Sequence, residues 1–201
     1  MNLCYIPDMQ VVLVFQLQQT TLPSHDEHLL YLWKVAKLLE PFAFPIENWY
    51  PSASTRKKSL ANPAFDRKGP TPVAGDMLRA KDKRVALDDY RITSVWNGAS
   101  KGRGCAFSVS LSTDAGNPIC LFDLQFYEVE EFDNPVNMKR FVLGLLDIWP
   151  VASQVNAGPL MYYTTYKVFP KRPGAGWMLY LPRPITASEL PEAAELVPCY
   201  A

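Results

Sequence analysis

The chain has 201 residues, in which 20 Lys and Arg balance 20 Asp and Glu, so its formal net charge is zero. Hydrophobic residues make up 48% and charged residues 20%, the proportions of an ordinary globular protein. This composition excludes a disordered chain, which needs low hydrophobicity and a high net charge. It also excludes a nucleic-acid binder of the histone type, because the chain carries no overall positive field.

The first part of the sequence predicts one β-strand and one helix. The apolar run at 11–15 predicts a β-strand, and Ser24 with Glu27 fits the capping box that begins a helix. Apolar residues recur at helical spacing over 25–39, and Pro41 ends the predicted helix.

The same apolar run is too short to span a bilayer, and it lacks the preceding basic residues of a signal peptide. The four cysteines form no Cys-x-x-Cys pair and have no neighbouring histidine, so the spacing of a structural zinc site is absent. We therefore expect reduced thiols, no membrane segment and a cytoplasmic protein. Residues 1–8 are interpreted as a loose leader, with Met9 as an alternative start.

The only two histidines, His25 and His28, lie at the start of the first predicted helix and share one face. A pair at this spacing can hold a metal, but no spacing in the sequence selects a third and a fourth ligand. We interpret both as part of a polar helix start and predict no metal site.

Residues 41–84 differ from the rest of the chain because they hold six of its 18 prolines. From Arg56 to Arg84, nine Lys and Arg stand against three Asp. We expect a long, irregular, basic loop region with one short helix near 74–81. Such a loop could bind nucleic acid through its positive charge. The only aromatic residue for base stacking between Arg56 and Arg84 is Phe65, so we prefer the interpretation of a solvated loop.

The remaining elements are those of an antiparallel sheet with a second helix. Period-two runs separated by turn residues predict a three-stranded meander and a C-terminal hairpin, and Asn134 with Pro135 opens a helix between them. We place these strands at 91–96, 105–111, 119–127, 160–169 and 177–181. The order predicts a single α+β domain over 1–201, in which an antiparallel sheet packs with two main helices.

The motifs of common enzymes are absent from the sequence. It contains no nucleophile elbow and no phosphate-binding loop. The Gly-x-Gly pairs at 102–104 and 174–176 are interpreted as turns, because no helix pattern follows either of them to hold a pyrophosphate. We expect no catalytic residues and no cofactor.

An acidic segment is the strongest functional candidate. Residues 114–133 hold six Asp and Glu and no Lys or Arg. These carboxylates either favour the N-terminus of the following helix or form an acidic rim that meets a basic partner. On the second interpretation, the candidate partner-binding residues are Asp123, Glu128, Glu130, Glu131 and Asp133, and the candidate aromatic anchors are Tyr163 and Trp177.

The segment at 168–182, Val-Phe-Pro-Lys-Arg-Pro-Gly-Ala-Gly-Trp-Met-Leu-Tyr-Leu-Pro, resembles the closing motif of the immunity protein 52 family. The meander and second helix fit the layout of that family, so the resemblance covers roughly 25–198. It implies an antidote in a bacterial polymorphic-toxin system, which binds and neutralises a cognate toxin. The toxin is often a nuclease of restriction-endonuclease fold delivered by type VI secretion. The family offers no catalytic motif to carry over, and its inhibitory residues are particular to each pair.

The sequence thus predicts an immunity protein that is not an enzyme, whose partner is a toxin with a basic, nuclease-like surface, and which itself binds neither nucleic acid nor membrane. Two alternatives stay open. One is an enzyme that uses carboxylates in an aromatic-lined cleft, acting on a sugar or another small molecule. The other is a nucleic-acid module that uses the basic stretch at 56–84.

Overall fold

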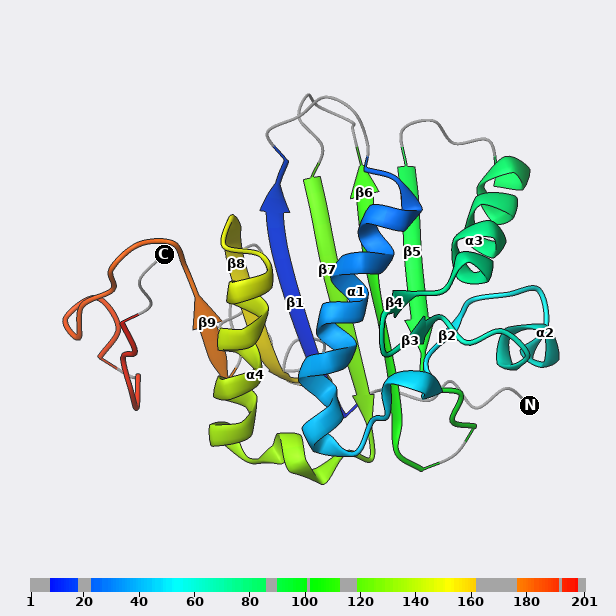
Figure 1. Cartoon of the computed structure of the whole chain (residues 1–201). Helices are drawn as coiled ribbons and strands as arrows, with labels where there is room; N and C mark the ends of the chain where they lie inside the picture. Colours follow the sequence, from blue (N-terminus) through cyan, green and yellow to red (C-terminus); the bar gives the residue numbers. More distant parts are fainter. Residues whose placement is uncertain are drawn as a thin grey trace.

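The computed structural model in Figure 1 describes residues 8–17, 23–85, 90–100, 102–112, 119–161, 177–191 and 193–198. Its main element is a seven-stranded antiparallel sheet in the order β2-β5-β6-β7-β1-β8-β9. The strands are β1 (Met9–Gln16), β2 (Tyr50–Pro51), β5 (Tyr90–Trp96), β6 (Gly104–Ser112), β7 (Ile119–Tyr127), β8 (Ala152–Pro159) and β9 (Met178–Tyr180). A small separate hairpin pairs β3 (Phe65–Asp66) with β4 (Gly69–Pro70).

Two long helices lie on the same face of the sheet, α1 (His25–Leu39) over its middle and α4 (Pro135–Ile148) over β8 (Figure 1). A third, α3 (Pro72–Val85), packs against α1 and β2 at one side, and the short α2 (Arg56–Leu60) lies beyond β2. The 3-10 turns are η1 (Glu40–Phe42), η2 (Ile46–Asn48) and η3 (Glu130–Asp133). None of the helices in the described ranges is long and apolar enough to cross a membrane.

The core lies between the sheet and these helices because each element has one apolar face. In β1, alternate residues from Met9 to Phe15 are buried, and the residues between them are partly exposed. The core is rich in aromatic rings: Phe122 lies 4.9 Å from Trp149, and Phe107 lies 4.6 Å from Trp49, between ring centroids. Contacts of this kind add to the stability that burial of the rings provides.

A second aromatic cluster fixes the end of β7. Phe132, in η3, is fully buried, and its ring centroid lies 4.0 Å from that of Phe126 and 4.7 Å from that of Phe42. Phe141 of α4 contacts the same ring edge-on at 5.5 Å. The turn between β7 and α4 is therefore held to the core by Phe132, together with the buried Val129.

The opposite face of the sheet, which we call the open face, lies away from α1 and α4 (Figure 1), and in the described part of the chain α2 contacts its margin, where Nε1 of Trp96 donates to Oγ of Ser59. Residues paired across a ladder point to the same side, so the register identifies its side chains. They form rows across β5, β6, β7 and β1: Tyr90, Ser112, Ile119 and Gln16; Ile92, Ser110, Leu121 and Val14; Ser94, Ser108, Asp123 and Val12; Trp96, Ala106, Gln125 and Gln10.

The α+β class predicted from the sequence is confirmed, as are the first strand, the meander and both main helices. The capping box of Ser24 and Glu27 is also present, with both of its backbone hydrogen bonds formed. These elements were predictable because their signals are local.

Two sequence predictions need correction. The loop region at 41–84 is more regular than predicted: it contains the 3-10 turns, the β3–β4 hairpin and two helices, and its short predicted helix is the 14-residue α3. The strand predicted at 160–169 is wrong at its start, since residues 160–161 are helical, and the rest lies outside the described residues. The partner of β9 is instead β8, which the sequence did not indicate.

Candidate functional site

Four of the predicted acidic residues lie together where β7 ends, in a surface that we call the acidic corner: Glu128, Glu130, Glu131 and Asp133. Glu128 adopts a left-handed backbone with φ of 52° and turns the chain from β7 towards η3. Its backbone N–H donates to Oδ2 of Asp8, 2.6 Å away, which ties the turn to the start of β1. Glu128, Glu130 and Asp133 are exposed.

The carboxylate of Glu131 is engaged within the protein. Arg103 donates from Nη1 to both carboxylate oxygens of Glu131, at 2.7 and 2.5 Å, and from Nη2 to the carbonyl oxygen of Phe42 at 2.7 Å. The Arg103 hydrogen bonds hold the pKa of Glu131 below its usual value. A partner that recruited this carboxylate would have to break the pair.

We expect Glu131→Gln to lower the free energy of unfolding by about 1 kcal/mol, because a partly exposed Arg pair with two charge-assisted hydrogen bonds is at the upper end for surface ion pairs. Glu130→Gln, one residue earlier and exposed, is the matched control and should change stability by less than about 0.5 kcal/mol. Urea unfolding of both variants at pH 7 checks this. Equal midpoints for the two variants would show that the pair contributes nothing.

The fifth predicted acid, Asp123, lies apart from the acidic corner, near the middle of the open face. Its two carboxylate oxygens accept from Nε2 of Gln10 at 2.9 Å and from Nε2 of Gln125 at 3.1 Å. The hydroxyl of Tyr127 donates to Oε1 of Gln125 at 2.9 Å, so a polar ladder runs along β7 from Asp123 to the acidic corner. Among the open-face side chains of the described strands, Asp123 alone is charged.

The other end of the open face carries exposed apolar side chains among Ser110, Ser112 and Gln16. Tyr90, Ile119 and Leu121 are exposed by 41%, 52% and 37%, and they lie in the two adjoining rows that are furthest from the acidic corner. The open face therefore combines exposed apolar side chains at one end with the hydrogen-bonded Asp123, Gln10 and Gln125 further along. Sequence reasoning missed Gln10, Gln125 and the apolar end, although the alternation of polar and apolar residues in 119–127 carried part of this signal.

Of the two predicted aromatic anchors, the structure describes one. Trp177, immediately before β9 at the edge of the sheet, is 49% exposed. Tyr163 lies outside the described residues, as does the segment 168–176 of the motif at 168–182.

The histidines are buried rather than part of a polar surface, which corrects the sequence interpretation. Nδ1 of His25 lies 2.8 Å and Nδ1 of His28 lies 3.3 Å from the hydroxyl of Thr93 on β5. No group of three or more metal-ligating side chains occurs within the described ranges. Cys105 and Cys120 are free and buried, and burial raises the pKa of the Cys120 thiol to about 12, which makes it a poor nucleophile.

The chain has no match among models of protein families, and no curated protein sequence matches it. Among solved structures it is similar to a T6SS protein of Pseudomonas aeruginosa, with a TM-score of 0.38 and 13% sequence identity. The similarity covers 76% of this chain and 42% of that chain, so this chain spans less than half of the length of the other.

Proposed function

We propose that this protein is an immunity protein, a non-enzymatic inhibitor that binds a cognate secreted toxin in a stoichiometric complex in the cytoplasm. The observation that carries the proposal is the open face, a sheet surface with exposed apolar side chains at one end and Asp123 near its middle, together with the acidic corner that follows the end of β7. Apolar patches bordered by polar groups are typical of protein–protein interfaces. The resemblance of 168–182 to the immunity protein 52 family supports this choice of partner.

The charge of the surface supports a nuclease as the toxin. A nuclease holds DNA or RNA phosphates with a basic surface, and an acidic inhibitor can occupy that surface. Asp123 supplies the charge within the open face, and the exposed carboxylates of Glu128, Glu130 and Asp133 supply it in the acidic corner, beyond the end of β7. In this proposal the apolar end gives most of the affinity, and the carboxylates give the association rate and the specificity.

The alternatives have less support from the described residues. The basic stretch at 56–84 is partly neutralised, because Arg79 is paired with Asp26 and Asp76, and Arg67 with Glu47. A sugar enzyme needs two facing carboxylates, and the cavity between α2 and α3 is lined by one, Asp76.

Co-expression with the product of the neighbouring gene tests the proposal, scored by growth rescue and by co-purification. We expect a tight complex that buries at least ~1,200 Å² in total. The charge reversals Glu130→Lys and Asp133→Lys together should weaken binding at least about tenfold and reduce its dependence on salt.

Asp147→Lys is the matched control, because this exposed carboxylate lies on α4, the helix that covers the other face. It should leave affinity unchanged. Rescue without a complex would contradict stoichiometric inhibition. If the charge reversals left the affinity and its salt dependence unchanged, the acidic corner would not contribute to toxin binding.

A further inference from the structure

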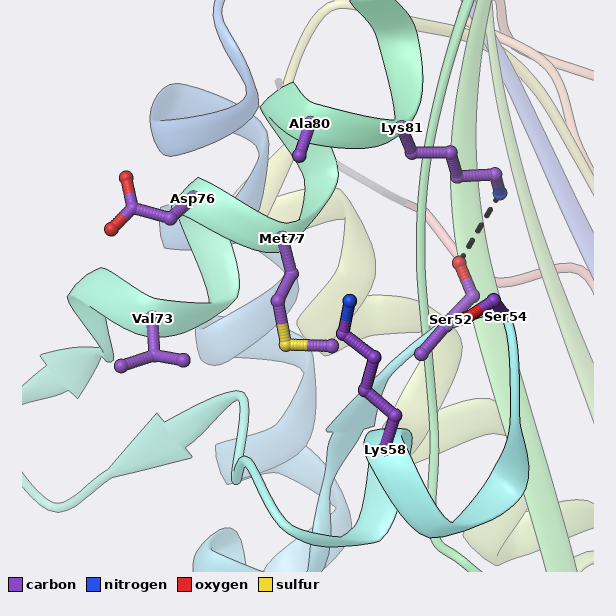
Figure 2. Close-up of a pocket in the computed structure, with 9 residues that line it drawn as sticks. Ser52, Ser54, Lys58, Val73, Asp76, Met77, Ala80 and Lys81 are labelled. Atoms are coloured by element: carbon purple, nitrogen blue, oxygen red, sulfur yellow. Dashed lines mark hydrogen bonds between the residues drawn. The ribbon is translucent and has the colours of Figure 1, made fainter. Parts of the chain in front are cut away.

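A cavity of about 340 Å³ lies between α2 and α3, beside the β2 edge of the sheet (Figure 2). This volume is within the range of small-molecule sites, about 300–1,000 Å³. Its apolar lining comes from both sides: Met77 extends from α3 into the space, with Val73 and Ala80 on the same helix and Ala53 on the facing loop. No residue of the described open-face rows lines this cavity, although Oγ of Ser94 donates to Oγ of Ser52, in the cavity wall, at 3.1 Å.

Two ammonium groups reach the cavity from opposite walls. Lys58 extends from α2 towards the end of the Met77 side chain, and Lys81 comes from α3 (Figure 2). Nζ of Lys81 donates to the hydroxyl of Ser52 at 3.3 Å. Across the residues that the structure describes, neither lysine is paired with a carboxylate.

The one acid that lines the cavity does not neutralise these lysines. Asp76 points away from the cavity in Figure 2, and its Oδ1 accepts from Nη2 of Arg79 at 2.8 Å. Arg79 is also bound to Asp26 of α1. The cavity therefore combines an apolar wall with a net positive mouth.

We propose that this cavity binds a small organic anion with an apolar body, whose carboxylate or phosphate head lies between Lys58 and Lys81. Lysine binds such heads as a point charge, and a charge-assisted hydrogen bond is stronger than a neutral one. The apolar body covers Met77 and its neighbours, which gains the free energy of removing apolar surface from water. The hydroxyl of Ser52, which accepts from Nζ of Lys81 and from Oγ of Ser94, has its own proton to donate to the head.

Titration of the whole protein with octanoate and octyl phosphate, followed by calorimetry, tests the proposal, and the difference between the two identifies the preferred head. Octanol and acetate are the ligand controls, because each lacks one half of the proposed chemistry. We expect saturable binding of at least one octyl anion, and at least about tenfold weaker binding of both controls. Equal binding of octanol, or no saturable binding of either anion, would overturn the proposal.

Substitutions of residues in and near the cavity show where the anion binds. Lys58→Gln with Lys81→Gln should weaken binding about tenfold or more, whereas Lys57→Gln, on the same helix but outside the cavity lining, should leave it unchanged. Ala80→Phe should block the cavity, and it is tolerated in folding because Ala80 is exposed. In methyl-labelled protein, the Met77 signal, assigned with Met77→Leu, should shift on addition of the bound anion. If the Met77 signal did not shift, or if Lys57→Gln weakened binding as much as the double lysine variant, the anion would bind elsewhere.

Discussion

Replacing Phe132 by alanine is expected to lower the free energy of unfolding by about 3–5 kcal/mol, the usual cost of removing a fully buried phenylalanine ring. The ring is completely buried and contacts three others, those of Phe42, Phe126 and Phe141. Its removal leaves a cavity under η3 that the rigid end of the sheet cannot fill. The midpoint of urea unfolding, followed by tryptophan fluorescence, measures the loss.

The matched control is Val136→Ala, four residues further along, where the side chain is 66% exposed. It should change stability by less than about 0.5 kcal/mol. If Phe132→Ala unfolded at the same urea concentration as this control, the aromatic cluster would not be what holds the acidic corner to the core.

Acidification is expected to destabilise the protein through His28. Burial, the positive charge of His25 and that of Arg91 lower the pKa of His28 from 6.5 to about 4, with Glu27 opposing weakly. Because the folded pKa lies below the unfolded one, the unfolded state binds more protons between pH 6.5 and pH 4. Stability is therefore highest above pH 6.5 and falls as the pH is lowered, by up to about 3 kcal/mol.

His28→Leu isolates this effect, since leucine cannot take up a proton and is similar in size. Stability should depend less on pH between 6.5 and 4.5 in this variant than in the native chain. Carboxylates with lowered pKa values, such as Glu27 and Glu131, lose their contribution at lower pH, where the unfolded value of 4.5 is reached. Urea unfolding at several pH values measures the slope, and parallel slopes for the two proteins would exclude His28 as the titrating group.

The elements that the sequence predicted have local signals, and the elements that it missed depend on distant neighbours. The helix at 25–39 is specified by its capping box and its periodicity. Strand β8, Ala-Ser-Gln-Val-Asn-Ala-Gly-Pro, has a low intrinsic preference for strand. It is extended because β1 pairs along it and α4 covers Ala152, Val155 and Ala157.

The prolines at 41–84 suggested an irregular loop, but their effect depends on position. Pro72 stands at the first position of α3, where a missing N–H costs nothing. Pro51 and Pro70 lie in two-residue strands. A count of prolines therefore could not distinguish helix starts and strand ends from loops.

The candidate surface was predictable as a set of acidic residues but not as a geometry. Arg103, which engages Glu131, lies 28 residues away, and Gln10, which donates to Asp123, lies 113 residues away. Neither separation leaves a pattern in the sequence, because strand pairing brings these residues together. Likewise, the burial of His25 and His28 depends on Thr93, which belongs to another element.

The edges of the sheet have a consequence for self-association. Exposed edge strands recruit further strands from other molecules, which leads to aggregation. Here the described sheet ends in β2, of two residues, and β9, of three, and β2 contains Pro51, which has no N–H to offer. Addition of a further strand to β2 or β9 themselves is thus disfavoured, because neither offers a long row of free backbone groups.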